Sequence, residues 1–427
     1  MSTGTAKIFS VSQKIWVKTN MSKLKIKASY RGQTIIIPEG RVDSTNAQDF
    51  SNFVLSARNE KPEASIVLDC AGLQYISSAG LRVLLTIQKK NNTPLTLRNV
   101  QPEVMDILDV TGFSQIFMIE NTVKEDSSQE IKDISGKHAA LMGESGGAAI
   151  YRMDNDMILK LSPSGTSLQD IQTELTQSKA ALICGVPTLI SYDAVKYNGR
   201  YGIRCEMPNV RAVSSLLSFQ QWNLSRHASE MGKTLRHIHT CRPEKGVLPK
   251  TSELFTGYAK RMGQYLNESE VSKLIDMINV IPDADTFVYG SYHSGNVFVL
   301  GDELILIDMS GISCGNPIFD LGMTYMIYVL EAEWLSKPLT GLDVQQAKIF
   351  WDLMMRSYFG TNDNADIKQY EPAVTAAAVL CSAVFPAINR ISQEDSSRLV
   401  MNTKKKLTAV YNTLYQVLAN ADFKEEI

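Results

Sequence analysis

The chain has 427 residues, and at roughly 100–200 residues per domain this length predicts two or three domains. Its 43 lysines and arginines nearly balance its 45 aspartates and glutamates, which argues against a general nucleic-acid binder with its usual basic excess. Hydrophobic residues make up 44% of the chain and charged residues 21%, a composition that excludes wholesale disorder. The six cysteines include no pair within four residues, so a local CxxC pair is excluded and a reduced, cytoplasmic protein is expected.

Two segments bear on targeting and membrane insertion. Residues 1–21 lack the apolar run of a signal peptide, and we expect them to be a disordered extension, with either Met1 or Met21 as the natural start. The longest apolar stretch, residues 372–388, has 17 residues, whereas a membrane span needs about 20. We therefore expect a buried helix there and no membrane partner.

The first part of the chain alternates short strands with short helices. Polarity and apolar runs predict strands over residues 23–30, 33–38, 65–70, 95–98 and 115–119, and helices over 47–58, 81–88 and 102–109. This order is typical of a mixed α/β domain with helices packed on a sheet, here over residues 22–120. Residues 121–136 are polar and predict a linker.

Residues 137–427 predict an α+β unit of two lobes. We expect a glycine turn and two strands over 139–160, a helix over 169–182, strands near 187–191 and over 201–206, and mainly helices from 214 onward, interrupted at 286–308. The small β-rich lobe then spans residues 137–207, and the helical lobe spans 208–427.

The first motif places two serines at the start of a helix. Ser77 and Ser78 follow a predicted strand and precede the predicted helix over 81–88. Free backbone N–H groups and the helix dipole favour negative charge there, so a phosphate on either serine is stabilised. The alternative is that the serines only cap the helix.

This segment resembles the signature of STAS domains, the fold of bacterial anti-sigma-factor antagonists. The resemblance covers residues 22–120 and includes a turn, GRVD, at 40–43 and the run YISSAGLR at 75–82. It implies that Ser78 is phosphorylated by a cognate serine kinase and that an anti-sigma factor or serine-kinase-like protein binds this surface. Many family members carry Asp where this chain has Ser77, so Ser77 stays an alternative site, as does a purely docking role.

A second group of residues suggests contacts to a nucleotide. Gly143, Gly146 and Gly147 are placed to form a turn that lets the backbone approach phosphates, and Lys160 follows on an apolar strand. Glu174, on the next predicted helix, can pair with Lys160. The alternative for these residues is an ordinary glycine-rich hairpin with an exposed lysine and a solvated carboxylate.

The clearest signal in the second unit is a predicted hairpin over residues 296–307. Its base brings Asn296 near Asp308, and an amide oxygen with a carboxylate suits Mg²⁺. The alternative is that both side chains only satisfy the backbone of the turn.

The segment resembles the aminoglycoside phosphotransferase and choline-kinase-like family over residues 139–360. The motifs are YGSYHSGN at 289–296, IDM at 307–309 and GNPIFDL at 315–321. The resemblance implies ATP and Mg²⁺ as cofactors. It assigns the nucleotide phosphates to Lys160 with Glu174, the adenine site to the strand that ends at Glu206 and Met207, and the metal to Asn296 and Asp308.

One position departs from that family. The catalytic aspartate is replaced by Ser291, and an alcohol is a poor base near pH 7. His293 is the nearby side chain that can substitute, although its family role is structural. We therefore expect a cytoplasmic signalling protein with a STAS-like switch and a nucleotide-binding domain of impaired catalysis. The alternatives are an active ATP-dependent phosphotransferase acting on a small-molecule or protein hydroxyl, and a pure interaction protein.

Overall fold

The structure, a computed structural model, forms two compact units. The first unit comprises residues 1–175 and 190–208, and the second comprises residues 176–189 and 209–427. The residues described are 15–17, 24–30, 33–43, 45–60, 62, 64–90, 94–120, 131–145, 147–153, 157–206, 210–219, 223–300, 303–309, 311–388 and 392–421.

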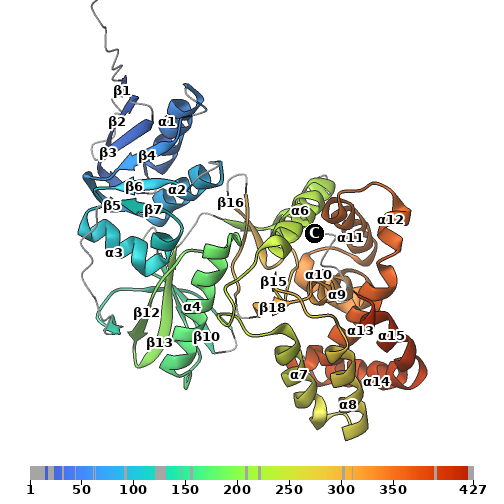
Figure 1. The fold of residues 1–427 in the computed structure, drawn as a ribbon. Helices are drawn as coiled ribbons and strands as arrows, with labels where there is room; N and C mark the ends of the chain where they lie inside the picture. Colours follow the sequence, from blue (N-terminus) through green and yellow to red (C-terminus); the bar gives the residue numbers. More distant parts are fainter. Residues whose placement is uncertain are drawn as a thin grey trace, which may run out of the picture. The chain divides into compact units, whose positions relative to one another are not determined.

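The first unit opens with a seven-stranded sheet (Figure 1). Its order is β1-β2-β3-β4-β6-β7, with β5 paired to β3. The strands are β1 Ile15–Val17, β2 Leu24–Tyr30, β3 Thr34–Val42, β4 Ile66–Asp69, β5 Gly72–Ile76, β6 Thr96–Arg98 and β7 Met118–Glu120. The helices are α1 Ala47–Glu60, α2 Ser78–Lys90 and α3 Pro102–Thr111, followed by the short 3-10 helix η1 Phe113–Gln115.

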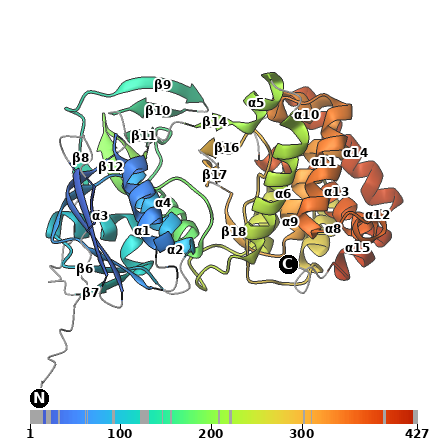
Figure 2. The same cartoon turned by 90° about the horizontal axis from the view of Figure 1, so that it is seen from above.

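The core of this sheet lies between β3 and the helices. Ile36 on β3, Phe50 on α1 and Leu81 on α2 are fully buried. α1 contacts both α2 and β3, and Figure 2 shows α1 beside α2. Burying such apolar faces is the main favourable term in folding, so these positions hold the helices against the sheet.

Four details differ from the sequence predictions. β1 lies inside the predicted disordered extension and pairs antiparallel with β2, so residues 15–17 are part of the sheet. The predicted turn at 40–43 is wrong: β3 runs through it, bending where Gly40 has φ 104° and where its pairing with β5 shifts register. The short strand β5 was not predicted. The last strand starts at 118 rather than 115 because η1 occupies residues 113–115.

A six-stranded sheet completes the first unit and forms the small lobe. Its order is β8-β12-β13-β11-β10-β9. The bounds are β8 Lys132–Asp133, β9 Ala140–Ser145, β10 Ala148–Arg152, β11 Met157–Leu161, β12 Ser191–Tyr197 and β13 Arg200–Glu206, with α4 Leu168–Cys184 packed on the sheet through buried Ile171. β8 and buried Ile134 lie within the predicted linker, so its end belongs to this sheet. Gly143 lies inside β9 rather than in the predicted turn, and β12 follows the strand predicted near 187–191.

The second unit is mainly helical. Its α-helices are α5 Val213–Phe219, α6 Leu224–Thr240, α7 Thr251–Arg261, α8 Glu268–Asn279, α9 Ile318–Tyr325, α10 Ala332–Thr340, α11 Val344–Phe359, α12 Asn364–Lys368, α13 Glu371–Ile388, α14 Gln393–Ala409 and α15 Tyr411–Ala419. Two short segments join them, the 3-10 helix η3 Met262–Gln264 and the π-helix η4 Met326–Leu330. The strands are β14 Arg211–Ala212, β15 Thr286–Val288, β16 Val297–Leu300, β17 Glu303–Leu306 and β18 Ser313–Gly315. α6 contacts α11, and α9 contacts α13 (Figure 2).

One helix in the described part of the chain, α13, is long and apolar enough to cross a membrane by length and composition. Within that helix 61% of the residues are buried inside the fold. Its Leu380, Cys381 and Val384 are fully buried in the main core of the second unit. The structure thus shows a buried helix over the apolar stretch, as the sequence predicts.

Candidate functional site

The start of α2 is built around Ser77 and Ser78. The N–H of Ser77 donates to the Val42 carbonyl at 2.8 Å, and its Oγ accepts from the Gly80 N–H at 3.5 Å. Ser77 therefore caps α2 and ties it to the end of β3. Ser78 is the first residue of the helix, and only 6% of it is exposed.

Gly80 lets α2 approach the sheet closely. A Cβ at this position would lie 2.6 Å from Ile76 and 2.8 Å from Val42, both well inside van der Waals contact. This explains why the run ISSAGLR needs a glycine: the first turn of α2 lies directly against β3 and β5.

Lys160 and Glu174 are brought together in the small lobe. Lys160 on β11 donates to Glu174 Oε1 on α4 at 2.8 Å, and both side chains are partly exposed. Gly147 adopts φ +85° at the start of β10, and Arg200 donates to its carbonyl at 2.5 Å. Gly143 faces open space, since a Cβ there would meet nothing within 4 Å. Gly146 and Met207 lie outside the described residues.

Glu206 is buried and its carboxylate is fully engaged. It accepts from the Ile190 N–H at 2.8 Å and from Arg82 Nε of α2 at 3.0 Å. Only 2% of Glu206 is exposed. The carboxylate of Glu206 therefore already has hydrogen-bond partners within the protein. A role of Glu206 in binding a nucleotide stays a prediction.

The loop over residues 289–296 in the second unit is closed by its own side chains. Asn296 Nδ2 donates to Ser291 Oγ and to the Ser291 carbonyl, both at 3.1 Å. Gly290 has φ +85°, and a Cβ there would lie 2.6 Å from the Gly311 carbonyl, so only glycine fits. Ser291 thus stands at a fixed place in a tightly defined loop.

His293 has the surroundings of a structural residue. Its Nδ1 accepts from the Gly295 N–H at 3.2 Å, and only 6% of the residue is exposed. Burial lowers the pKa of His293 to about 4, against the opposing effect of a hydrogen bond to the Leu339 backbone. The ring is neutral at pH 7, and the nitrogen that would act as a base is already in use.

Asp320, in the GNPIFDL motif, braces this loop. Its carboxylate accepts from the N–H groups of Tyr289 at 2.7 Å and Gly290 at 2.6 Å. His239 of α6 lies 3.1 Å from the same carboxylate and 2.7 Å from the Tyr358 hydroxyl of α11. The GNPIFDL motif contains Asp320, but the sequence gives no sign of its contact with His239, because the two residues lie 81 positions apart.

Asp308 follows β17, and the hairpin pairing of Val297 with Leu306 places it at the same base as Asn296. Asp308 is exposed to solvent, whereas Asn296 is half-buried. Among the described residues no three His, Cys, Asp or Glu side chains gather to hold a metal. A site of one carboxylate and one amide oxygen nevertheless fits Mg²⁺, which usually keeps several waters and binds substrate phosphates.

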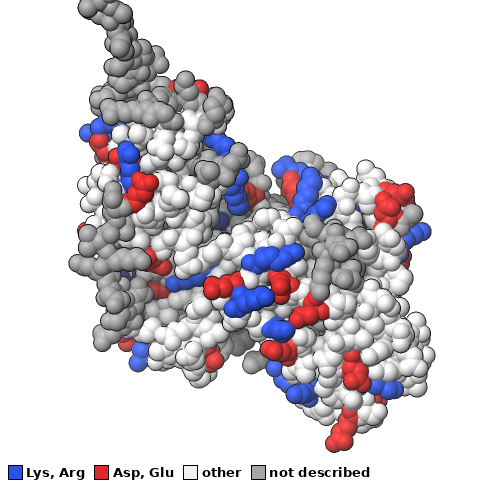
Figure 3. Space-filling model, in the orientation of Figure 1, with Lys and Arg blue, Asp and Glu red and all other residues white. Residues whose placement is uncertain are grey.

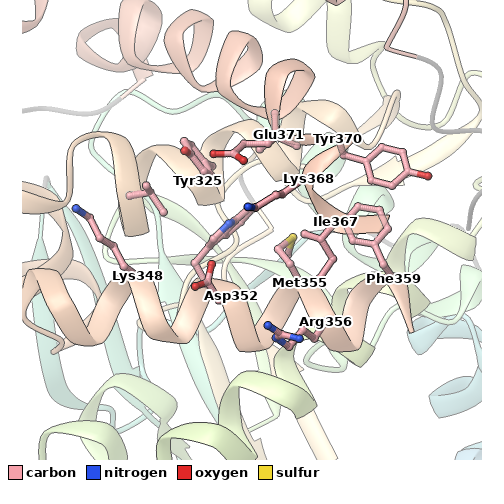
Figure 4. A pocket seen from close by; sticks show the side chains of 13 residues that line it. Tyr325, Lys348, Asp352, Met355, Arg356, Phe359, Ile367, Lys368, Tyr370 and Glu371 are labelled. Atoms are coloured by element: carbon pink, nitrogen blue, oxygen red, sulfur yellow. The ribbon is translucent and has the colours of Figure 1, made fainter. Parts of the chain in front are cut away.

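A separate pocket of about 350 Å³ lies among the helices of the second unit. Figure 4 shows side chains of α11 facing those of residues 367–371 across it. Burial raises the pKa of Asp352 in its wall, opposed by nearby Arg356. Its lining residues, none of which belongs to the 289–296 loop, are Tyr325, Val329, Lys348, Trp351, Asp352, Met355, Arg356, Phe359, Ile367, Lys368, Tyr370, Glu371 and Val374.

Comparison with known families gives the two parts their identity. Residues 25–126 match the STAS domain family, and residues 145–341 match the phosphotransferase enzyme family. The chain carries a STAS domain and a phosphotransferase-family domain. The resemblances drawn from the sequence are confirmed, as is the fold class: a mixed STAS sheet with helices and a kinase-like fold with a helical C-terminal region.

A curated relative supports the first assignment. BtrV of Bordetella bronchiseptica, which is named as an anti-sigma factor antagonist, is 44% identical over 59 residues, or 14% of this chain and 50% of that protein. The chain therefore spans about half the length of this relative.

Solved structures are similar at low sequence identity. A choline/ethanolamine kinase family protein of Mesorhizobium loti is 12% identical, with 67% of this chain and 94% of that one covered and a TM-score of 0.43. ADP-bound aminoglycoside phosphotransferase APH(2'')-Ib is 12% identical, with 66% and 93% covered and a TM-score of 0.42. Amicoumacin kinase hAmiN is 12% identical, with 66% and 90% covered and a TM-score of 0.45.

Proposed function

We propose that this chain is a cytoplasmic signalling protein in which a phosphorylatable STAS switch is joined to a nucleotide-binding, kinase-like domain with impaired catalysis. The observation that carries the proposal is the loop at 289–296. Its glycine, its Asp320 brace and its Asn296 contact are all in place, but the residue that would take the acceptor's proton is Ser291. General-base help is typically worth 10²–10⁴-fold, so its loss leaves binding with little turnover.

Nucleotide binding is assigned to the residues that the sequence resemblance singles out. Lys160, held by Glu174, contacts the phosphates, with the backbone at Gly143, Gly146 and Gly147 near them. When bound, Mg²⁺ neutralises phosphate charge; Asn296 and Asp308 would hold it. The strand that ends at Glu206 and Met207 lines the adenine.

Partner binding is assigned to the STAS domain. A STAS domain points in general to anti-sigma-factor-type partners, and here we propose an anti-sigma factor or a serine-kinase-like protein. Phosphorylation of Ser78, or of Ser77, would add about −1.5 to −2 charges and change which partner is bound. Mass spectrometry of the chain isolated from growing and starved cells tests this, and finding both serines always unmodified contradicts it.

Calorimetric titration of ATP, with and without Mg²⁺, tests nucleotide binding. We expect Lys160→Met to weaken binding at least about tenfold in both conditions, because it removes a charge from the phosphates. Asp308→Asn should remove only the part that depends on Mg²⁺. Lys196→Met, on β12 two strands away in the same sheet, is the matched control and should bind normally. If the wild type shows no affinity in the millimolar range, the domain is an interaction scaffold.

An active phosphotransferase is the second candidate, favoured by the match of residues 145–341 to an enzyme family. The acceptor would be a small-molecule or protein hydroxyl. Steady ATP turnover by the wild type, abolished by Asp308→Ala, would support this function over impaired catalysis.

A further inference from the structure

The first turns of α2 lie directly against the small lobe. Arg82 Nε donates to Glu206 Oε2 at 3.0 Å, and a second guanidinium nitrogen of Arg82 contacts Glu206 Oε1. The two residues are 124 positions apart, yet both belong to the first unit. α3 of the STAS domain also contacts β12 of the small lobe.

This ion pair differs from an ordinary surface pair because Glu206 is buried. Only 2% of the Glu206 side chain and 17% of the Arg82 side chain are exposed. A buried carboxylate that loses its counter-charge carries a large desolvation cost, whereas an exposed pair contributes little. The small lobe therefore holds a charge that needs the STAS domain to neutralise it.

Ser78 is covered by the same contact. Ser78 and Glu206 both lie close enough to the Tyr192 side chain on β12 to influence its pKa. Burial is the main reason why the pKa of Tyr192 is raised, so the hydroxyl stays neutral. Tyr192 thus lies near the start of α2, where an anion would otherwise be favoured.

We propose that the small lobe of this chain is the resident partner of the STAS surface at the start of α2, and that negative charge on Ser78 releases it. We define this surface by Ser78 and Arg82, and its partner by Tyr192 and Glu206.

Modification of Ser78 is incompatible with the docked arrangement. When a serine kinase transfers the γ-phosphoryl group of ATP, an O–P bond forms at Ser78 Oγ, the bond to ADP breaks and the hydroxyl proton passes to that kinase's base. The product brings about −1.5 to −2 charges and three oxygens into a contact that already holds the Glu206 carboxylate. Repulsion and lack of space both favour separation, and separation exposes the STAS surface to another protein.

Docking itself does not depend on nucleotide binding or on Ser291, so it can be tested apart from the proposed function. Only the identification of Ser78 as the modified residue rests on that function. Hydrogen–deuterium exchange of the full chain reports on both sides of the contact, through peptides covering residues 78–90 and 191–206.

We expect Arg82→Ala to speed exchange in residues 191–206 by at least about tenfold, because a buried carboxylate loses its partner. Ser78→Asp should do the same. Arg98→Ala removes an ion pair to Asp69 within the STAS domain and is the first control. Ser77→Asp is the second, because Asp caps a helix as Ser does. Both controls should leave residues 191–206 unchanged.

The outcomes separate the possibilities. Faster exchange in both peptides with Arg82→Ala and Ser78→Asp, and not with the controls, supports the proposal. Unchanged exchange in residues 191–206 with Arg82→Ala overturns it. Equal effects of Ser77→Asp and Ser78→Asp overturn the assignment of the release to Ser78. If a folding defect obscures the result with Arg82→Ala, Tyr192→Phe serves in its place. It keeps the ring, removes the hydroxyl and should give an intermediate increase in the exchange rate of residues 191–206.

Discussion

Ser291 occupies the position at which the family resemblance places the catalytic aspartate. Asn296 Nδ2 donates to its Oγ at 3.1 Å, a bond that an aspartate oxygen at the same position can also accept. The main-chain N–H groups of the two preceding residues are fixed by Asp320. The loop thus holds the side chain at position 291 in one orientation. What is missing is a basic group, because the Ser291 hydroxyl is a poor base.

Replacing Ser291 by Asp should therefore raise ATP hydrolysis or phosphotransfer. The gain can approach the 10²–10⁴-fold range of general-base effects. Ser291→Asn is the matched control, because it has the same shape without a base. Asp308→Ala in the Ser291→Asp background should abolish the gain, which an initial-rate assay measures. Robust wild-type turnover that survives His293→Ala would instead favour the active enzyme.

His293 should make stability depend on pH. Its folded-state pKa is lowered to about 4 from 6.5, so the unfolded chain takes up a proton first as the pH falls. The stabilisation is complete above pH 6.5 and is lost between 6.5 and about 4, amounting to about 2 kcal/mol between pH 7 and pH 5.

Denaturant unfolding of His293→Asn at both pH values checks this. The variant is expected to be less stable at pH 7 but to lose less stability on going to pH 5 than the wild type. Buried His227, whose pKa is also lowered, remains in both proteins and contributes equally. An identical loss in variant and wild type would contradict the assignment.

Among the elements, the sequence predicts those with a strong local pattern. The hairpin of β16 and β17, the helix α2 and the mainly helical character of the second unit follow from apolar spacing and turn residues. β1, β5 and β8 were missed because they are two to five residues long and are strands only through their pairing. The sequence predicts a turn at Gly40, but a glycine in a strand often marks a bend instead.

The packing of α2 on the sheet gives a prediction about one element. Gly80→Ala should destabilise the STAS domain by about 1–3 kcal/mol, since its Cβ would lie 2.6 Å from Ile76. Gly257→Ala, in the interior of α7 with nothing within 4 Å, is the matched control and should stabilise by about 0.5–1 kcal/mol. Thermal unfolding measures both, and a neutral Gly80→Ala would show that α2 is free to shift.

At the scale of the whole molecule, the contacts that join distant segments could not be read from the sequence. Arg82 and Glu206 are separated by 124 residues, and His239 and Asp320 by 81. Each partner alone looks like an ordinary helix or strand residue, because charge pairing at such separations leaves no local pattern. The chemical groups of the 289–296 loop could be predicted from the sequence. The contacts of Asp320 and His239 that hold this loop in place could be identified only from the fold. On the face shown in Figure 3, acidic and basic side chains are interspersed, in keeping with the net charge of −2.

The division into two compact units predicts how the chain unfolds. Each unit has its own core, so scanning calorimetry should show at least two transitions rather than one two-state step. Gly232→Ala should lower a transition of the second unit, because its Cβ would lie 2.2 Å from the Met354 carbonyl where α6 meets α11. Gly80→Ala should lower a different transition. A single transition that both substitutions shift equally would mean that the two units unfold together, and that their cores are coupled more strongly than their separate packing implies.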